Sequence, residues 1–148
     1  IMHTQLRAIL RASVFGKLRI MFPMIISVEE FRSLKVELAE LKEELRNEGI
    51  PFDENIEVGI MIETPAAVMI GEELAKRVDF LGIGTNDLTQ YTLAMDRQNP
   101  LLQKKYDDHH PAILKMIKMI VDAGHAQNCK VCLCGELAAD SPAGQAGA

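Results

Sequence analysis

The sequence lacks the features that would place it in a membrane, on a nucleic acid or outside the cell. Its longest uninterrupted apolar run, Ile20 to Ile26, is far too short to cross a bilayer. The first residues mix Arg7 and Arg11 with apolar positions at helical spacing, which is unlike a signal peptide. Basic residues are not in excess, because 16 lysines and arginines are scattered among 21 acidic residues. We therefore expect no nucleic-acid partner and no membrane insertion.

Cysteine is also scarce, and its three copies lie close together at Cys129, Cys132 and Cys134. An odd, clustered set without an export signal predicts reduced thiols and a cytoplasmic protein. A zinc site formed with His125 is a weaker alternative. Cys129 precedes the segment that holds the other two, and no second cysteine pair follows.

The chain does have the composition of a globular domain, with 148 residues, 48% hydrophobic and 25% charged. A chain of this length can bury a core without metal or disulfide bridges. No repeat or break in composition divides it, so we expect residues 1–148 to form one unit. Because it begins at Ile1 rather than Met, we expect a fragment of something longer. The tail 139–148, rich in small residues, is expected to be frayed.

Short apolar segments alternate with amphipathic helical segments along the chain. Strands are predicted at Leu18–Phe22, Glu57–Ile62, Val78–Ile83 and Lys130–Leu133. Helices are predicted at His3–Val14, from Ser27 to Gly49, at Pro65–Arg77 and at Pro111–Ala126. This α/β alternation implies parallel strands joined by helical crossovers. Four such strands make half of a (β/α)8 barrel or a small doubly wound sheet, because a complete barrel needs about 250 residues.

Chemically useful side chains follow three of these strands. Glu63 comes directly after the second strand, Asp87 lies in a polar loop after the third, and Cys134 directly follows the fourth. The carboxyl ends of parallel strands share one edge, so we expect these residues and Arg97 to lie together. Two carboxylates with open coordination positions suit Mg²⁺. The planar guanidinium of Arg97 suits a phosphate or carboxylate.

Each of these residues also has an ordinary structural interpretation. Asp87 and Gln90 have the spacing of a helix capping box. Glu63 is placed where a helix dipole favours an acid. Cys134 fits an inert buried thiol, and Arg97 fits an ordinary surface arginine. The residue types alone leave these alternatives open.

The order of residues within the motifs favours the functional interpretation of these side chains. The segment Phe80–Arg97, which contains the run Thr-Asn-Asp-Leu-Thr-Gln-Tyr, closely resembles the signature of the phosphoenolpyruvate-utilising enzymes. Met61–Ala67 and Cys134–Asp140 resemble the two other active-site segments of that family. Gln5–Ser13 and Arg19–Met24 extend the resemblance, most closely to the branch that serves bacterial sugar uptake. Nearly the whole chain, from about residue 3 to 140, takes part.

The resemblance implies a particular fold and site. The fold would be the later half of a C-terminal (β/α)8 barrel that binds phosphoenolpyruvate and mediates dimerisation. Glu63 and Asp87 match the family's Mg²⁺ ligands, and Asn86, Asp87 and Arg97 match residues that hold phosphoenolpyruvate. Cys134 matches the acid that protonates the enolate to give pyruvate. The family passes the phosphoryl group to a histidine on another domain and then to a histidine-containing phosphocarrier protein.

The chain also departs from the family pattern. Ala139 stands where the family usually has glycine, and an expected apolar helix is missing after Asp140. The histidine domain and the upstream arginines of the phosphate site are absent, so we expect the chain alone to be catalytically incomplete. Pyruvate phosphate dikinase and phosphoenolpyruvate synthase remain alternatives within the family. The contrasting alternative is a non-catalytic half-barrel whose open sheet edges pair with a second copy.

Overall fold

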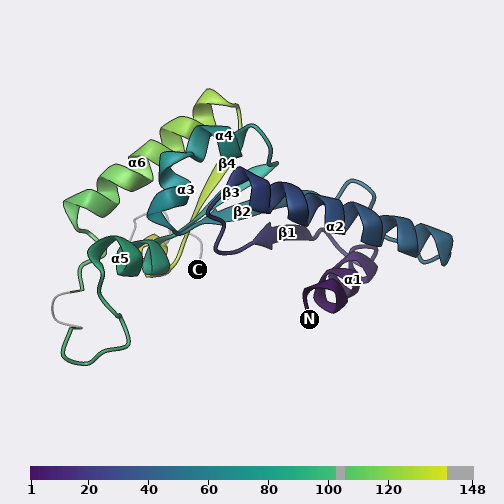
Figure 1. Cartoon of the computed structure of the whole chain (residues 1–148), viewed down its shortest axis with the longest axis horizontal. Coiled ribbons are helices and arrows are strands. Elements are labelled where there is room, and N and C mark those ends of the chain that lie inside the picture. Colours follow the sequence, from purple (N-terminus) through teal and green to yellow (C-terminus); the bar gives the residue numbers. More distant parts are fainter. Residues whose placement is uncertain (103–105, 140–148) are drawn as a thin grey trace.

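The computed structural model describes residues 1–102 and 106–139 and shows one parallel sheet with flanking helices (Figure 1). The strands are β1 (Arg19–Phe22), β2 (Glu57–Ile62), β3 (Phe80–Gly84) and β4 (Lys130–Cys134). They lie in the order β1-β2-β3-β4, so every strand pairs with its neighbour in sequence. The predicted α/β class and parallel pairing are confirmed. The predicted frayed tail lies outside the described residues, except for Ala139.

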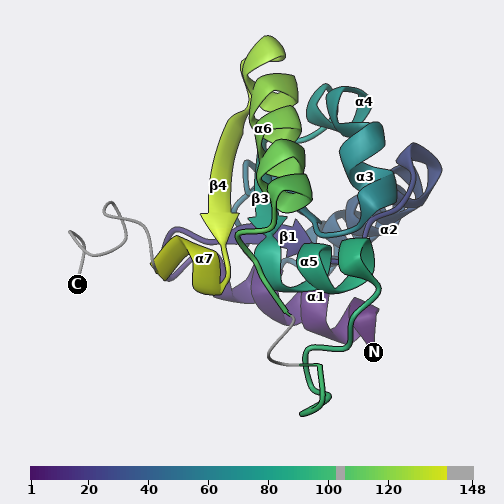
Figure 2. The same ribbon diagram turned by 90° about the vertical axis from the view of Figure 1, so that its left-hand side faces the viewer.

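Helices follow each strand and precede the first. They are α1 (Met2–Ala12), α2 (Val28–Asn47), α3 (Pro65–Met69), α4 (Gly71–Ala75), α5 (Thr85–Leu93), α6 (Pro111–Ala126) and α7 (Glu136–Ala139). Figure 2 shows α6 alongside β3 and β4, with α7 and α5 at the opposite end of these strands from the start of β4. No helix among residues 1–102 and 106–139 is both long and apolar enough to cross a bilayer.

Alternate side chains of the strands form the core with the helices. Those that point to the helices and are buried are Ile20, Phe22, Val58, Ile60, Ile62, Leu81 and Ile83. Phe22 meets Phe31 of α2 edge-on, with ring centroids 6.4 Å apart. Burying one such side chain contributes about 1.5–3 kcal/mol, so this layer holds the helices on the sheet. The order β1-β2-β3-β4 with covering helices is half of a (β/α)8 barrel.

The other face of the sheet is more open and is populated by small and sulfur-containing residues. A Cβ on Gly82 would lie 2.7 Å from Met21 Sδ and 3.3 Å from Met61 Sδ, so both methionines cover this glycine. Cys132, which pairs with Gly82 in register, is exposed. This face corresponds to the interior of a barrel, and the candidate site lies at its carboxyl edge.

Several details differ from the sequence prediction. The helix predicted over Pro65–Arg77 is broken at Ile70, whose φ of −109° and ψ of 20° are not helical. The first helix ends before Val14, because the Ser13 hydroxyl donates to the Leu10 carbonyl and accepts the Asp53 N–H. On α6, Ile113 is buried, whereas the adjacent Leu114 is 47% exposed although it is also apolar.

Candidate active site

Glu63 is positioned where β2 ends and α3 begins. Thr64 caps α3 by accepting the Ala67 N–H at 3.2 Å, and Pro65 occupies the first turn. These two residues turn the chain away directly after Glu63, which follows Ile62, the last residue of β2. The Glu63 carboxylate remains at the carboxyl edge of the sheet, where it is 7% exposed.

A backbone amide fixes one oxygen of this carboxylate. Met24, just after β1, donates its N–H to Glu63 Oε1 at 2.7 Å. Met24 has a φ of 54°, an uncommon conformation for a residue with a side chain. The loop after β1 therefore accepts local strain while its amide holds Glu63.

Asn86 and Asp87 do not lie in a loop, as the sequence predicted. Strand β3 runs straight into α5, which begins at Thr85, so both residues occupy the first helical turn. Asp87 is consequently not an N-cap, and the capping-box interpretation is wrong. Gln90 instead accepts the backbone N–H of Arg97 through Oε1 at 3.3 Å. The first turn of α5 thus presents its polar side chains directly at the sheet edge.

The environment of Glu63, including the Asp87 carboxylate, shifts the pKa of Glu63. Burial raises the pKa of Glu63, the hydrogen bond from Met24 lowers it, and the nearby Asp87 carboxylate raises it further. A Cβ on Gly84 would lie 2.8 Å from Glu63 Oε2, so the carboxylate packs against the junction of β3 and α5. Glu63 is buried and Asp87 is half-buried, and two acids from neighbouring strand ends are a donor set that a hard divalent cation such as Mg²⁺ would neutralise.

Arg97 returns to this pair from the far end of α5. The helix ends at Leu93, and Ala94 follows in the left-handed conformation with a φ of 52°, which reverses the chain. Arg97 Nη2 then lies 3.5 Å from Asp87 Oδ1, and the Arg97 side chain is 38% exposed. A half-exposed pair of this kind adds little stability. Its guanidinium is, however, well placed to meet an anionic ligand.

The side chain of Asn86 joins α5 to the turn after β4. Asn86 Oδ1 accepts the Glu136 N–H at 3.3 Å, and the Tyr106 hydroxyl donates to the Asn86 carbonyl at 2.8 Å. With its oxygen engaged in this way, the amide orients its NH2 group as the donor that a ligand would meet.

Cys134 is the last residue of β4 and pairs with Gly84 of β3. Thr85, which is fully buried, donates its hydroxyl to the Cys134 carbonyl at 3.1 Å. Gly135 follows with a φ of 103°, and a Cβ there would collide with the Thr85 hydroxyl. Burial raises the pKa of Cys134, and the neighbouring Cys132 raises it further. The thiol is therefore protonated at neutral pH.

The structure brings the predicted residues to one edge of the sheet. Glu63, Asp87 and Arg97 form one charged group, and Asn86 is tied to the turn that follows Cys134. Two positioning groups, the Met24 amide and the Thr85 hydroxyl, were not predicted from the sequence. A backbone amide leaves no side-chain signal, whereas Thr85 lay inside the recognised motif and its contact depends on the pairing of β3 with β4.

The described residues do not support the zinc alternative. Cys129 is buried at the opposite end of β4 from Cys134, with Sγ 4.0 Å from the Val78 carbonyl. Within the described ranges, the one group of three potential ligands gathered closely is Asp107, Asp108 and His109, on the loop before α6. Neither the cysteines nor His125 belong to it.

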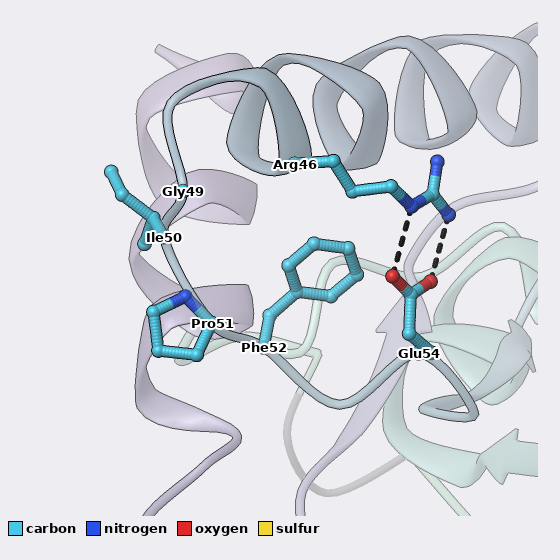
Figure 3. Close-up of a pocket in the computed structure, with 6 residues that line it drawn as sticks. All are labelled: Arg46, Gly49, Ile50, Pro51, Phe52 and Glu54. Atoms are coloured by element: carbon cyan, nitrogen blue, oxygen red, sulfur yellow. Dashed lines mark hydrogen bonds and ion pairs between the residues drawn. The ribbon is translucent and has the colours of Figure 1, made fainter.

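Cavities occur at the other end of the sheet. One lies between the end of α2 and the loop that leads to β2, where Arg46 holds Glu54 with two hydrogen bonds of 2.8 and 2.7 Å (Figure 3). The Phe52 ring lies beneath this pair, 5.7 Å from the guanidinium carbon. The hydrogen bonds hold the pKa of Glu54 below its usual range. This exposed clamp secures a loop and is remote from the candidate site.

Comparison with known families identifies the class of protein. The profile of the family described as "PEP-utilising enzyme, PEP-binding domain" matches residues 1–145. The match includes every candidate site residue. The chain therefore belongs to the PEP-utilising enzymes, as part of their PEP-binding domain.

Individual relatives point to one branch of this family. The chain is 57% identical over 143 residues to the phosphoenolpyruvate-protein phosphotransferase of Haemophilus influenzae, covering 97% of the chain and 25% of the relative. The protein of the same name from Enterococcus faecalis is 49% identical over 141 residues, covering 95% and 24%. The chain thus spans about a quarter of the length of the curated relatives it matches.

The fold also recurs in a more distant protein. A citrate lyase from Burkholderia xenovorans LB400 superposes with a TM-score of 0.65 and 23% identity, covering 88% of this chain and 40% of that chain. This likeness concerns the fold alone. It agrees with the assignment of the chain as part of an α/β barrel.

Proposed function

We propose that the chain is the part of a phosphoenolpyruvate-protein phosphotransferase that binds phosphoenolpyruvate. Its site would consist of Glu63, Asn86, Asp87, Arg97 and Cys134. The observation that supports this most strongly is the meeting of Glu63 and Asp87, with Arg97 beside Asp87, at the carboxyl edge of the sheet. Ligands of parallel α/β folds bind at this edge.

Glu63 and Asp87 would hold Mg²⁺. The Met24 amide occupies Glu63 Oε1, so Oε2, which faces the β3–α5 junction, would bind the ion. When bound, the ion supplies positive charge that offsets the charge of the phosphoryl group and the developing enolate. Arg97 adds a fixed positive charge beside Asp87 and would bind an oxygen of the phosphate.

Asn86 and Cys134 would act on the remainder of the substrate. Asn86 would donate from its NH2 group to a ligand oxygen, because its own oxygen accepts from Glu136. Loss of the phosphoryl group leaves an enolate, which becomes pyruvate when its methylene carbon gains a proton. Cys134 would supply that proton, since its raised pKa keeps the thiol protonated.

The wider role that we propose needs parts beyond this chain. The phosphoryl group would pass to a histidine on another domain and then to the histidine-containing phosphocarrier protein of bacterial sugar transport. We further propose a cytoplasmic location and a homodimer. The chain by itself should be catalytically incomplete, and pyruvate formation from phosphoenolpyruvate by the purified chain would contradict this.

Two alternatives remain distinguishable. A barrel segment of pyruvate phosphate dikinase or phosphoenolpyruvate synthase would use similar site residues, but the names of the relatives above favour the phosphotransferase. A non-catalytic pairing module would rest on the open edges of β1 and β4 alone. Such a module would self-associate and ignore phosphoenolpyruvate.

Calorimetric titration of phosphoenolpyruvate into the chain, with and without Mg²⁺, tests the proposal. Binding should require Mg²⁺ and should be lost in Asp87→Asn. The matched control is Asp122→Asn, which removes an exposed carboxylate on α6 that pairs only locally with Lys118. Equal binding by both variants would refute the assigned site. No binding by the intact chain would show that this quarter of the relatives does not form the site alone.

A further inference from the structure

A tyrosine fastens the connection between α5 and α6 to the candidate site. Tyr106 donates its hydroxyl to the backbone carbonyl of Asn86 at 2.8 Å, although the two residues are 20 positions apart in the sequence. We propose that Tyr106 is a positioning residue, which holds Asn86 and Arg97 in place for an anionic ligand without touching that ligand itself. The proposal rests on the function proposed above, because it concerns the same site.

The backbone and the side chain of Asn86 are held by two different segments. Asn86 lies in the first turn of α5, and its carbonyl oxygen has two lone pairs, so it can accept the tyrosine in addition to a helical N–H. Separately, Asn86 Oδ1 accepts the Glu136 N–H at 3.3 Å. Tyr106 therefore restrains the backbone of Asn86, while the turn after β4 restrains its amide group.

A series of backbone hydrogen bonds links Tyr106 to the neighbourhood of Arg97. The Tyr106 N–H donates to the Leu102 carbonyl at 3.1 Å. Asn99 continues the series, since it accepts the Leu102 N–H at 3.0 Å and donates its own N–H to the Asp96 carbonyl at 3.1 Å. Asp96 directly precedes Arg97, so the series ends beside the candidate phosphate-binding side chain.

Gln90 of α5 holds the start of the same stretch. Its side-chain Oε1 accepts the Arg97 N–H at 3.3 Å, and its carbonyl accepts the Met95 N–H at 3.0 Å. Residues 94–102 project away from the sheet, below α5 in the view of Figure 1. Arg97 thus lies in a connection that Gln90 holds at its start and Tyr106 holds at its return. Loss of the tyrosine hydroxyl would release one of these two anchors and give the guanidinium more freedom.

The charges around the phenol agree with this arrangement. Burial raises the pKa of Tyr106, whereas the Thr89 hydroxyl and the positive charge of Arg97 lower it. The effect of Arg97 is that of a guanidinium near the phenol. The hydroxyl remains protonated at neutral pH, because an unperturbed tyrosine already has a pKa of about 10. Tyr106 is therefore able to donate to the Asn86 carbonyl under physiological conditions.

Hydrogen exchange with water, measured by NMR, tests the positioning role without any ligand. In Tyr106→Phe, the Arg97 Nε–H and the backbone N–H groups of Arg97 and Glu136 should exchange several-fold faster. These backbone groups donate to Gln90 and Asn86 and not to Tyr106, so the effect must pass through the positioned residues. Unchanged exchange rates in Tyr106→Phe would overturn the proposal.

A second tyrosine and the core provide the controls for this measurement. Tyr91→Phe removes the hydroxyl of a tyrosine on α5 that is 46% exposed, and it should leave the exchange rates unchanged. The backbone N–H groups of β2, whose apolar side chains belong to the core, should keep their rates in Tyr106→Phe. If all N–H groups exchanged faster together, the tyrosine would stabilise the fold in general, which would contradict a positioning role.

A double-mutant cycle extends the test to the ligand. Phosphoenolpyruvate with Mg²⁺ is titrated into the unaltered chain, Tyr106→Phe, Arg97→Gln and the double variant. Tyr106→Phe should bind several-fold more weakly, and its effect should shrink once Arg97 is replaced, because the tyrosine acts partly through that residue. Fully additive losses would contradict the proposal. If the unaltered chain does not bind, that result concerns the proposed function, and the exchange rates still decide the role of Tyr106.

Discussion

Met24 donates its backbone N–H to Glu63 Oε1 at 2.7 Å from a backbone conformation with a φ of 54°. The loop after one strand thereby orients the acid at the end of the next. The contact combines a strained backbone with a candidate metal ligand, a combination frequent at functional sites. The destabilisation caused by the strained backbone and the effect of the contact on the site can be measured separately.

Substitution of Met24 measures the strain. Met24→Val should destabilise the fold by about 1–2 kcal/mol, because β-branched residues tolerate a positive φ poorly. Met24→Gly should be close to neutral, since the relief of strain offsets the greater freedom of glycine in the unfolded chain. Urea denaturation of both variants measures the difference. Equal stabilities would show that the backbone at Met24 is not strained.

Adding a methyl group at Gly84, beside Glu63, should damage the site. In Gly84→Ala, the new methyl group would lie 2.8 Å from Glu63 Oε2 and 3.0 Å from Glu63 Cβ. We expect a loss of about 1–3 kcal/mol in stability and at least a tenfold loss in Mg²⁺ affinity. Gly16→Ala is the control, because a Cβ there meets nothing within 4 Å. Unchanged Mg²⁺ binding in Gly84→Ala would contradict the geometry.

The raised pKa of Glu63 predicts how stability depends on pH without metal. Glu63 binds its proton more tightly in the folded chain than in the unfolded one. Its contribution therefore becomes more unfavourable as the pH rises from the unfolded pKa, about 4.3, to the raised folded value. Above the folded pKa the full penalty is present. Glu63→Gln should consequently be more stable than the unaltered chain at neutral pH.

This advantage of Glu63→Gln should shrink as the pH falls, because the native Glu63 becomes protonated. Thermal denaturation in the presence of a chelator, repeated across the acid range, measures the effect. A constant difference between the two proteins at all pH values would show that Glu63 does not titrate in this way. With Mg²⁺ present the order should reverse, since only the carboxylate binds the ion well.

Thr85 should position the end of β4 through its hydroxyl. Thr85→Val keeps the shape but removes the donor to the Cys134 carbonyl, so we expect a loss of about 1–3 kcal/mol. Thr85→Ser keeps the hydroxyl and should lose less. In Cys132→Ser protein, alkylation of Cys134 should be faster with valine at position 85 than with threonine or serine. If serine and valine behave alike, the hydroxyl has no positioning role.

The sequence was informative wherever one local signal dominated. Strand β2 and helix α6 have the predicted bounds, because a continuous apolar run and a Pro111 start are strong signals. The sequence was less informative where tertiary contacts determine the bounds of a helix or strand. The break at Ile70 occurs where Gly71 packs near Ala123 of α6, a contact that no local pattern reveals.

The candidate site also contains features that the sequence predicted and features that it did not. The sequence predicted that Glu63 and Asp87 lie close together, because parallel strands bring their ends to one edge. It misplaced Asn86 and Asp87 in a loop, since Gly84-Thr85 has the look of a turn although the strand passes directly into α5. The assigned roles of Glu63, Asn86, Asp87, Arg97 and Cys134 remain predictions for the experiments above.

The sequential strand order has a consequence for how the molecule is made. Among the described strands, β2, β3 and β4 each pair with the strand that is synthesised just before them. As the chain leaves the ribosome, β1 and β2 can join first and provide the template for β3, then β4. Glu63 would be held by Met24 before Asp87 emerges. Glu63, Asp87 and Cys134 would therefore reach the candidate site in the order in which they are synthesised.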